Sequence, residues 1–155
     1  MLGDPVRKIM RKRKLLTARP GEKVARAAQR MAARNVGAML VVEEGRLIGI
    51  ITERDVVFRV VALGLDPTLA QVSEVMTRDP VTIEADAPFG YALVVMHCQG
   101  FRHLPVLKDG VPVGIISARS ALDPDLEEFA SEISRRKYFA KMAAAPASAS
   151  RPLAR

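Results

Sequence analysis

The residues in this sequence whose spacing points most directly to chemistry are Thr52 and Asp55, three positions apart. The apolar run Leu47 to Ile51 before them predicts a buried strand that ends at Thr52. A helix beginning at Glu53 would offer backbone amides and a favourable dipole to a phosphate, beside the Thr52 hydroxyl. The Asp55 carboxylate, one helical turn further on, can accept two hydrogen bonds from a diol. The pair therefore offers groups that could meet a phosphate and a diol.

The same spacing is also typical of a structural helix cap. In a capping box, a hydroxyl and an acid three residues apart satisfy backbone amides at the start of a helix. A matching stretch later in the chain, Ser117 to Ser120, keeps the hydroxyl and lacks the acid. A fold that forms without an acid at that place favours a ligand role for Asp55, and the capping role stays open beside it.

These two stretches belong to an internal repeat, which is the main organising feature of the chain. Three stretches of the first half recur in the second half: 41–45 as 106–110 and 49–52 as 114–117 at an offset of 65 residues, and 6–10 as 72–76 at an offset of 66. A period this long that occurs only twice indicates a duplicated domain rather than a solenoid.

Each copy is predicted to contain a lead-in helix, a strand, a helix, a two-stranded hairpin and a second helix. Hydrophobic spacing and the turns Glu44-Gly45 and Asp109-Gly110 indicate these elements. The lead-in helices end at Met10 and Met76, and the remaining bounds are strands 15–18 and 81–84, helices 23–34 and 88–99, and hairpin strands 39–42, 47–51, 104–107 and 111–116. Pro88 suits a first helical turn. The second helix is expected from Thr52 to about Leu63, and Pro124 interrupts its counterpart.

The predicted fold class is thus α/β (α+β), with the unit β-α-β-β-α present twice. We expect a first repeat over residues 1–66, a second over 67–123, a C-terminal helix over 124–142 and a disordered tail over 143–155, where Ala, Ser and Pro dominate. Aromatic residues make up only 5% of the chain against 49% hydrophobic residues, so the core must be aliphatic.

The charge and the composition limit the partners and the compartment. The net charge of +7 could meet nucleic acid, a membrane surface or phosphorylated small molecules, or it could simply be a solvated surface. No aromatic stacking platform or known binding motif stands beside the basic residues, so we do not expect a nucleic-acid partner. The single Cys98 fits a reducing cytoplasm, and the apolar runs are too short for a bilayer. We therefore expect a cytoplasmic protein with no secretory signal and no membrane partner.

The duplicated order of elements resembles the CBS-domain pair, also called a Bateman module, over residues 4 to about 122. The stretches that carry the resemblance are Gly49-Ile-Ile-Thr-Glu-Arg-Asp55, Val75-Met76-Thr77, Phe101-Arg-His-Leu-Pro-Val106 and Gly114-Ile-Ile-Ser117. The family implies two repeats packed with pseudo-two-fold symmetry, a regulatory role without catalysis, and binding of AMP, ADP, ATP or a related adenosyl compound. It also implies a homodimer, and this chain looks like a stand-alone version.

The resemblance also implies which residues surround each ligand, because each cleft draws its base pocket from the opposite repeat. For the cleft of Thr52 and Asp55, the implied lining is Ile50, Met76, Val81, Phe101 and His103. Val81 and Phe101 would sandwich the adenine, and His103 would approach the phosphate. Plain core packing, or a surface position for His103, is the alternative for these side chains. The second cleft, implied at Ser117, Leu16, Val36, Ala38 and Arg102, lacks the acid and is expected to be weak or empty.

Other chemistry finds little support in the residues. His97, Cys98 and His103 are too few, and the first two project in different directions from a helix, so no metal site is expected. Nothing orients a base beside Cys98, and no oxyanion device is evident, so we expect no enzyme and no required cofactor. Two alternatives to nucleotide sensing remain: an architectural dimerisation or partner-binding module with degenerate clefts, and a basic protein associated with nucleic acid.

Overall fold

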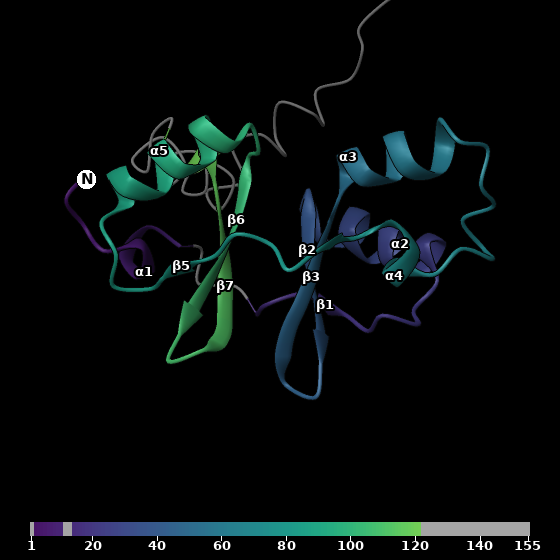
Figure 1. The fold of residues 1–155 in the computed structure, drawn as a ribbon, viewed down its shortest axis with the longest axis horizontal. Helices are drawn as coiled ribbons and strands as arrows, with labels where there is room; N and C mark the ends of the chain where they lie inside the picture. The colour runs from purple at the N-terminus through teal and green to yellow at the C-terminus, as the bar shows by residue number, and fades with distance from the viewer. Residues whose placement is uncertain (1, 11–13, 122–155) are drawn as a thin grey trace, which may run out of the picture. The chain divides into compact units, whose positions relative to one another are not determined.

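A computed structural model describes residues 2–10 and 14–121, which form two β-sheets with helices packed against them (Figure 1). This agrees with the α/β class and the duplicated unit that the sequence predicts. The predicted helix over 124–142 and the predicted tail over 143–155 lie outside the described residues.

The first sheet has four strands in the order β1-β2-β3-β4. Strands β1 (Thr17–Ala18) and β2 (Ala38–Glu43) pair in parallel, and helix α2 (Val24–Arg34) connects them. Strand β3 (Arg46–Thr52) returns antiparallel to β2 and leads into helix α3 (Glu53–Asp55), which continues as the π-helix η1 (Val56–Val61). The helix expected from Thr52 to about Leu63 is therefore present, but its second part has the wider π-type winding.

The second sheet repeats this plan with three strands, β5-β6-β7. Strand β5 (Ile83–Glu84) runs parallel to β6 (His103–Lys108), and β7 (Val111–Ser117) is antiparallel to β6. Helix α5 (Phe89–Gln99) connects β5 to β6, and a short 3-10 helix, η2 (Ala118–Ala121), follows β7. The interruption expected at Pro124 lies outside the described residues.

The hairpins show how closely the two copies match. Each carries a register shift at the same repeat position, between Val41 and Val42 and between Val106 and Leu107. Both predicted turns are present, with positive φ at Glu44, Gly45, Asp109 and Gly110. Two central residues with positive φ define the turn whose twist matches that of the flanking strands.

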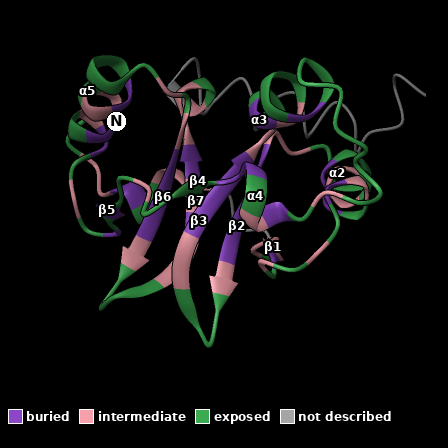
Figure 2. Ribbon diagram, turned by 45° about the vertical axis from the view of Figure 1, so that its right-hand side comes forward, coloured by how far each residue is buried: buried purple, intermediate pink, exposed green. Residues whose placement is uncertain are grey.

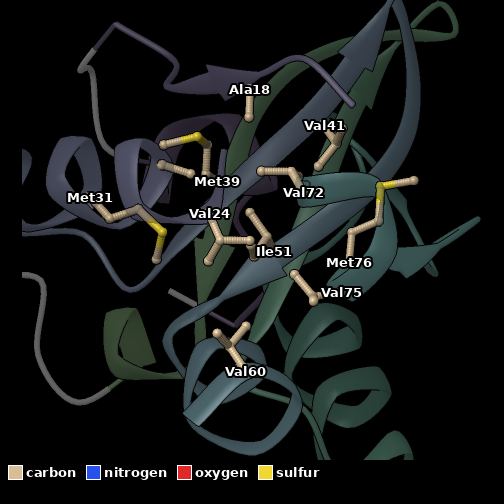
Figure 3. Packing of buried hydrophobic residues seen from close by; sticks show 11 residues of the cluster. Ala18, Val24, Met31, Met39, Val41, Ile51, Val60, Val72, Val75 and Met76 are labelled. Atoms are coloured by element: carbon tan, nitrogen blue, oxygen red, sulfur yellow. The ribbon is translucent and has the colours of Figure 1, made fainter. Parts of the chain in front are cut away.

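Each lead-in helix packs on the other repeat. Helix α1 (Val6–Ile9) places Val6 in the core cluster of the second sheet, and the Val6 amide donates to the Ala87 carbonyl at 2.9 Å. Helix α4 (Val72–Val75) places its valines in the core cluster of the first repeat, as Figure 3 shows, and the Val72 amide donates to the Glu22 carbonyl at 2.8 Å. Each packed unit therefore contains the lead-in helix that precedes the other repeat in the sequence. The predicted halves 1–66 and 67–123 each include their own lead-in helix instead.

The core is aliphatic, as the composition predicts, and Phe89 is the only fully buried aromatic side chain among the described residues. Buried residues occupy parts of β2, β3, β6 and β7 and one side of each long helix (Figure 2). A third, smaller cluster joins the repeats, because Ala38, Leu40 and Ile50 of the first pack with Ile115 of the second. Ile50 and Ile115 occupy equivalent repeat positions, so this seam lies where the duplicated sheets meet.

Several boundaries differ from those predicted. Strand β4 (Thr77–Arg78) was not expected from the sequence, and it pairs with Gly49 and Ile50 at the free edge of β3. The strands expected over 15–18 and 81–84 are each only two residues long, and Val81 lies before β5 rather than in it. Pro88 caps α5 with an extended backbone instead of forming its first turn.

Candidate functional site

Thr52 and Asp55 are in direct contact at the junction of β3 and α3. The Asp55 Oδ2 atom accepts hydrogen bonds from the Thr52 amide and the Thr52 hydroxyl, both at 2.8 Å. The Asp55 amide donates to Thr52 Oγ1 at 3.3 Å. These bonds form a capping box. The helix-capping role, which the spacing of the two residues left open, is therefore present in the folded chain.

The backbone amides at this helix start are largely engaged, which corrects the expectation that they wait for a phosphate. The Glu53 amide donates to the carbonyl of Gly37 at 3.0 Å, and the Asp55 amide is bonded to Thr52. The connection between α2 and β2 supplies the Gly37 carbonyl, which the sequence alone does not place beside the helix start. A phosphate at this position would have to rely on side chains more than on these two amides.

The carboxylate of Asp55 still has capacity for a ligand. Asp55 is the one buried charged residue of the described part of the chain, at 8% exposure. Its Oδ2 holds Thr52, while its Oδ1 lies 3.5 Å from Nε of Arg59, which is a distance for an ion pair rather than a short hydrogen bond. Because each carboxylate oxygen can accept two bonds, Oδ1 can accept one from a ribose hydroxyl.

The second repeat shows the same junction without the acid. The Ala118 amide donates to the carbonyl of Arg102 at 2.9 Å, which matches the bond from Glu53 to Gly37 one repeat earlier. Ser117 and Ser120 place their hydroxyl oxygens 3.4 Å apart, where the first repeat has Thr52 and Asp55. The backbone therefore adopts this turn with or without a carboxylate, which supports a role for Asp55 beyond folding.

The residues implied as a base pocket do not all gather at the site. Ile50 and Met76 are 6% and 5% exposed and pack in core clusters. This agrees with the alternative that these two side chains belong to the core. They lie near each other, since Ile50 pairs with Thr77 across β3 and β4. Phe101 is half-buried against the core of the second repeat, and Val81 is exposed. That Val81 and Phe101 would sandwich an adenine stays a prediction.

His103 reaches the first repeat across the seam. Its ring and the Glu53 side chain both adjoin Gly37, because a Cβ atom at Gly37 would lie 3.3 Å from His103 Cε1 and 3.2 Å from Glu53 Cδ. Burial lowers the pKa of His103 below its usual value, the Glu53 carboxylate acts in the opposite direction, and Arg102 and Arg119 lower this pKa further. A neutral imidazole beside the end of β3 is therefore the favoured state near pH 7.

The residues implied for the second cleft are spread over different surroundings. Leu16 and Val36 are half-buried against the first core cluster, and Ala38 is buried in the seam. Arg102 is exposed, and its carbonyl accepts a hydrogen bond from the amide of Ala118, the residue after Ser117. Arg102 also lines an open pocket of about 520 Å³, together with Glu53, Arg54, Val57, Phe58 and Gly100.

Sequence reasoning missed two residues of this region. Arg59 contacts Asp55, and Gly37 accepts the first helical amide and leaves room for Glu53 and His103. The four-residue spacing of Asp55 and Arg59 was a usable signal, because such pairs meet on a helix. Gly37 gave none, since its counterpart in the second repeat is Arg102.

The described residues show neither a metal-binding cluster nor a helix that could span a membrane. Residues 2–10 and 14–121 contain no group of three or more His, Cys, Asp and Glu side chains placed to hold a metal ion. Within the same ranges, no helix combines the length and the apolar character needed to cross a bilayer.

The fold is a duplicated α/β module. Its two repeats exchange their lead-in helices and meet at a seam, and each has a hydroxyl group at the end of its hairpin. The sequence model of the CBS domain matches residues 6–62 and 72–127. The chain therefore belongs to the CBS-domain family and contains a CBS-domain pair, which is a regulatory module. This confirms the resemblance seen in the sequence.

Known proteins similar to this chain agree with that assignment. The CBS domain-containing protein CBSCBSPB2 of Arabidopsis thaliana is 39% identical over 121 residues, covering 77% of this chain and 23% of the plant protein. The chain thus spans about a quarter of that relative. A conserved protein from Pyrococcus horikoshii has a similar crystal structure, with a TM-score of 0.73, 29% identity and coverage of 79% and 92% of the two chains. The CBS domain protein PAE2072 from Pyrobaculum aerophilum, in complex with AMP, shares the fold with a TM-score of 0.71 at 23% identity, over 82% and 98% of the two chains.

Proposed function

We propose that this chain is a non-catalytic regulatory module that binds one adenine nucleotide, AMP, ADP or ATP, at Thr52 and Asp55. The observation that carries the proposal is the buried Asp55 carboxylate, which keeps acceptor capacity on Oδ1 while Oδ2 is fixed by Thr52. A fixed carboxylate with a free lone pair suits a ribose hydroxyl. The fold supports the proposal, because PAE2072 has it and is in complex with AMP.

The difference between the repeats supports one nucleotide per chain. A charge-assisted hydrogen bond contributes roughly 1.5–3 kcal/mol, which corresponds to about ten- to a hundred-fold in affinity. Ser120 cannot supply that bond where Asp55 can. The cleft at Ser117 is therefore expected to bind nucleotide weakly or not at all. At the Thr52 and Asp55 site, we expect neutral His103 to donate a hydrogen bond near the phosphate.

A second candidate function rests on the capping box itself. Both the Thr52 hydroxyl and the Asp55 carboxylate already have protein partners, so the junction is complete without a ligand. In that case the module is architectural, and its role is to dimerise or to bind another protein. A homodimer and a cytoplasmic location are part of both candidates.

The second repeat supplies the control that separates these candidates. Asp55→Ser gives the first junction the pair of groups present at Ser117 and Ser120. Isothermal titration calorimetry with AMP, ADP and ATP should show one site per chain in the unmodified protein and at least tenfold weaker binding in Asp55→Ser. Ser120→Asp is the reciprocal variant and should strengthen the second cleft. Two equal sites per chain, or binding that Asp55→Ser leaves unchanged, would exclude the proposed site. No binding by the unmodified chain would favour the architectural candidate.

A further inference from the structure

Arg59 joins two segments of the first sheet that are distant in sequence. It lies in η1, one turn beyond Asp55, and its Nε is 3.5 Å from Asp55 Oδ1. Its Nη1 donates to the carbonyls of Val75 at 2.9 Å and Met76 at 3.0 Å. One guanidinium group thus contacts both the Asp55 carboxylate, which is the candidate ligand-binding group, and the segment where α4 ends and β4 begins.

The contact with α4 satisfies carbonyl groups at the C-terminal end of that short helix. The last carbonyls of a helix have no partner within it, and a basic side chain is one of the groups that can satisfy them. A guanidinium presents several donors in a fixed plane, so it can hold two carbonyls and a carboxylate at once. An ammonium group carries the same charge without that planar set of donors.

The contact with Asp55 is made at the carboxylate oxygen that Thr52 does not use. Thr52 holds Oδ2 through two hydrogen bonds, and Arg59 stands beside Oδ1, the oxygen with remaining acceptor capacity. The Asp55 side chain is 11% exposed and that of Arg59 is 47% exposed, so the pair lies at the boundary of the buried site. A ligand hydroxyl that bonds to Oδ1 must therefore share this oxygen with Arg59.

The segment held by Arg59 is also part of the site. Met76 lies over Gly49, and Thr77 pairs with Ile50, so the residues that follow α4 lead into β4, the edge strand of the sheet beside Ile50. The second repeat has Pro124 at the position equivalent to Arg59. Both the acid and the arginine are thus specific to the first repeat.

We propose that Arg59 is a positioning residue that orients the Asp55 carboxylate and couples ligand binding there to the position of the segment Met76–Arg78. This inference rests on the proposed function, because it concerns the same site. Arg59 acts through Asp55 and through two backbone carbonyls. Removing it should therefore weaken nucleotide binding and also break the connection between the ligand and β4.

Arg30 provides a matched control within the same repeat. Its guanidinium binds the Glu22 carboxylate at 2.8 Å and the Thr17 carbonyl at 2.8 Å, so it combines an ion pair with a backbone contact as Arg59 does. Its side chain is 36% exposed. Arg30→Ala removes a similar set of contacts away from Asp55, and it reports what a purely structural arginine contributes.

The test combines calorimetry with hydrogen exchange on the full chain, using AMP and ATP as probes. In Arg59→Ala the dissociation constant should rise about tenfold, the scale at which a residue that couples two sites acts. Arg59→Lys should restore only part of the affinity, and Arg30→Ala should leave the affinity unchanged even if it lowers stability. Bound nucleotide should slow amide exchange in residues 76–78 of the unmodified chain and of Arg30→Ala. At saturating nucleotide, Arg59→Ala should lose this protection.

The outcomes separate the inference from the proposed function. If the unmodified chain binds nucleotide and Arg59→Ala binds equally well, or keeps the protection of residues 76–78, the role of Arg59 is wrong while the site stands. If Arg59→Ala and Arg30→Ala weaken binding equally, the effect is one of stability and the inference is again overturned. If the unmodified chain binds neither AMP nor ATP, the proposed function fails, and the inference fails with it for that separate reason.

Discussion

The side chain of Met76 occupies the space that a Cβ atom would need at Gly49. Its sulfur would clash with a Cβ atom added there, and the Thr77 carbonyl oxygen would lie 3.0 Å from that Cβ. The second repeat has the same arrangement between Gly114 and Met10. The glycine that begins each Gly-x-x-Thr or Gly-x-x-Ser stretch thus admits a methionine from a lead-in segment, and this explains the residue type without reference to a ligand.

Gly49→Ala should destabilise the protein by about 1–3 kcal/mol, because the added methyl group meets both a buried side chain and backbone. Gly21→Ala is the control, since nothing lies within 4 Å of a Cβ at that turn residue. Chemical denaturation of both variants measures the difference in the free energy of unfolding. Equal stability of Gly49→Ala and the unmodified chain would show that Met76 can move aside at little cost.

Asp55→Ala should destabilise the ligand-free protein by about 0.5–2 kcal/mol, the usual contribution of a helix cap. The carboxylate holds both the amide and the hydroxyl of Thr52, and these bonds exist without nucleotide. Ser120→Ala is the matched change in the second repeat, where the two hydroxyl groups are 3.4 Å apart, and it should alter stability by less than about 0.5 kcal/mol. Thermal denaturation without nucleotide compares the two variants, and equal losses would contradict a special role for the acid.

The sequence predicted the elements that depend on local patterns. The helices 23–34 and 88–99 are present to within one residue, as α2 and α5, because their apolar residues recur at helical spacing. The hairpin turns follow from Glu44-Gly45 and Asp109-Gly110, which adopt positive φ. The capping box that the spacing of Thr52 and Asp55 allows is also formed, whereas the choice of this pair as a ligand site depended on the repeat and the family resemblance.

Features that depend on contacts between distant segments were not predicted. Strand β4 exists because Thr77 and Arg78 reach the edge of β3, and no local pattern marks them as a strand. The capping of the helix start by Gly37 depends on where the connection before β2 passes. The lead-in helices carry the same apolar residues whichever repeat they pack against, so their exchange is invisible in the sequence.

Exposed apolar residues on η1 should support the homodimer that both candidate functions include. Val57, Phe58 and Val61 are 52%, 55% and 70% exposed, which leaves a run of apolar surface on one helix. Val61→Glu should shift the protein from dimer to monomer in multi-angle light scattering at micromolar concentration. Val111→Glu is the control, since Val111 is 56% exposed in a hairpin away from this helix. A monomeric unmodified chain would contradict the prediction directly.

The basic residues should bind nucleic acid only in a non-specific, salt-sensitive way. Arg7 pairs with Asp86, and Lys8 lies 3.4 Å from Asp4, so part of the N-terminal charge is already balanced within the protein. Fluorescence anisotropy with two unrelated oligonucleotides should show equal affinities that fall steeply as salt rises. A preference for one sequence that persists at about 0.15 M salt would instead support the nucleic-acid alternative.

His103 should make the stability of the protein depend on pH in the mildly acidic range. Burial lowers its pKa in the folded protein, so between that value and about 6.5 the unfolded chain binds more protons than the folded one. Under this condition the free energy of unfolding rises with pH. The contribution of neutral His103 is therefore complete above about pH 6.5 and is lost as the pH falls through the folded-state pKa.

His103→Gln isolates this contribution, because glutamine keeps a polar side chain beside Glu53 and does not titrate. The difference in melting temperature between His103→Gln and the unmodified chain should change in favour of the variant as the pH falls from about 7 to 5. His97→Gln removes the only other histidine, which is exposed, and it assigns the two imidazole signals in an NMR titration. The titration should place the pKa of His103 below about 6.5. A value above that would mean that the attraction of Glu53 outweighs burial, and the stability of the unmodified chain would then increase relative to His103→Gln on acidification.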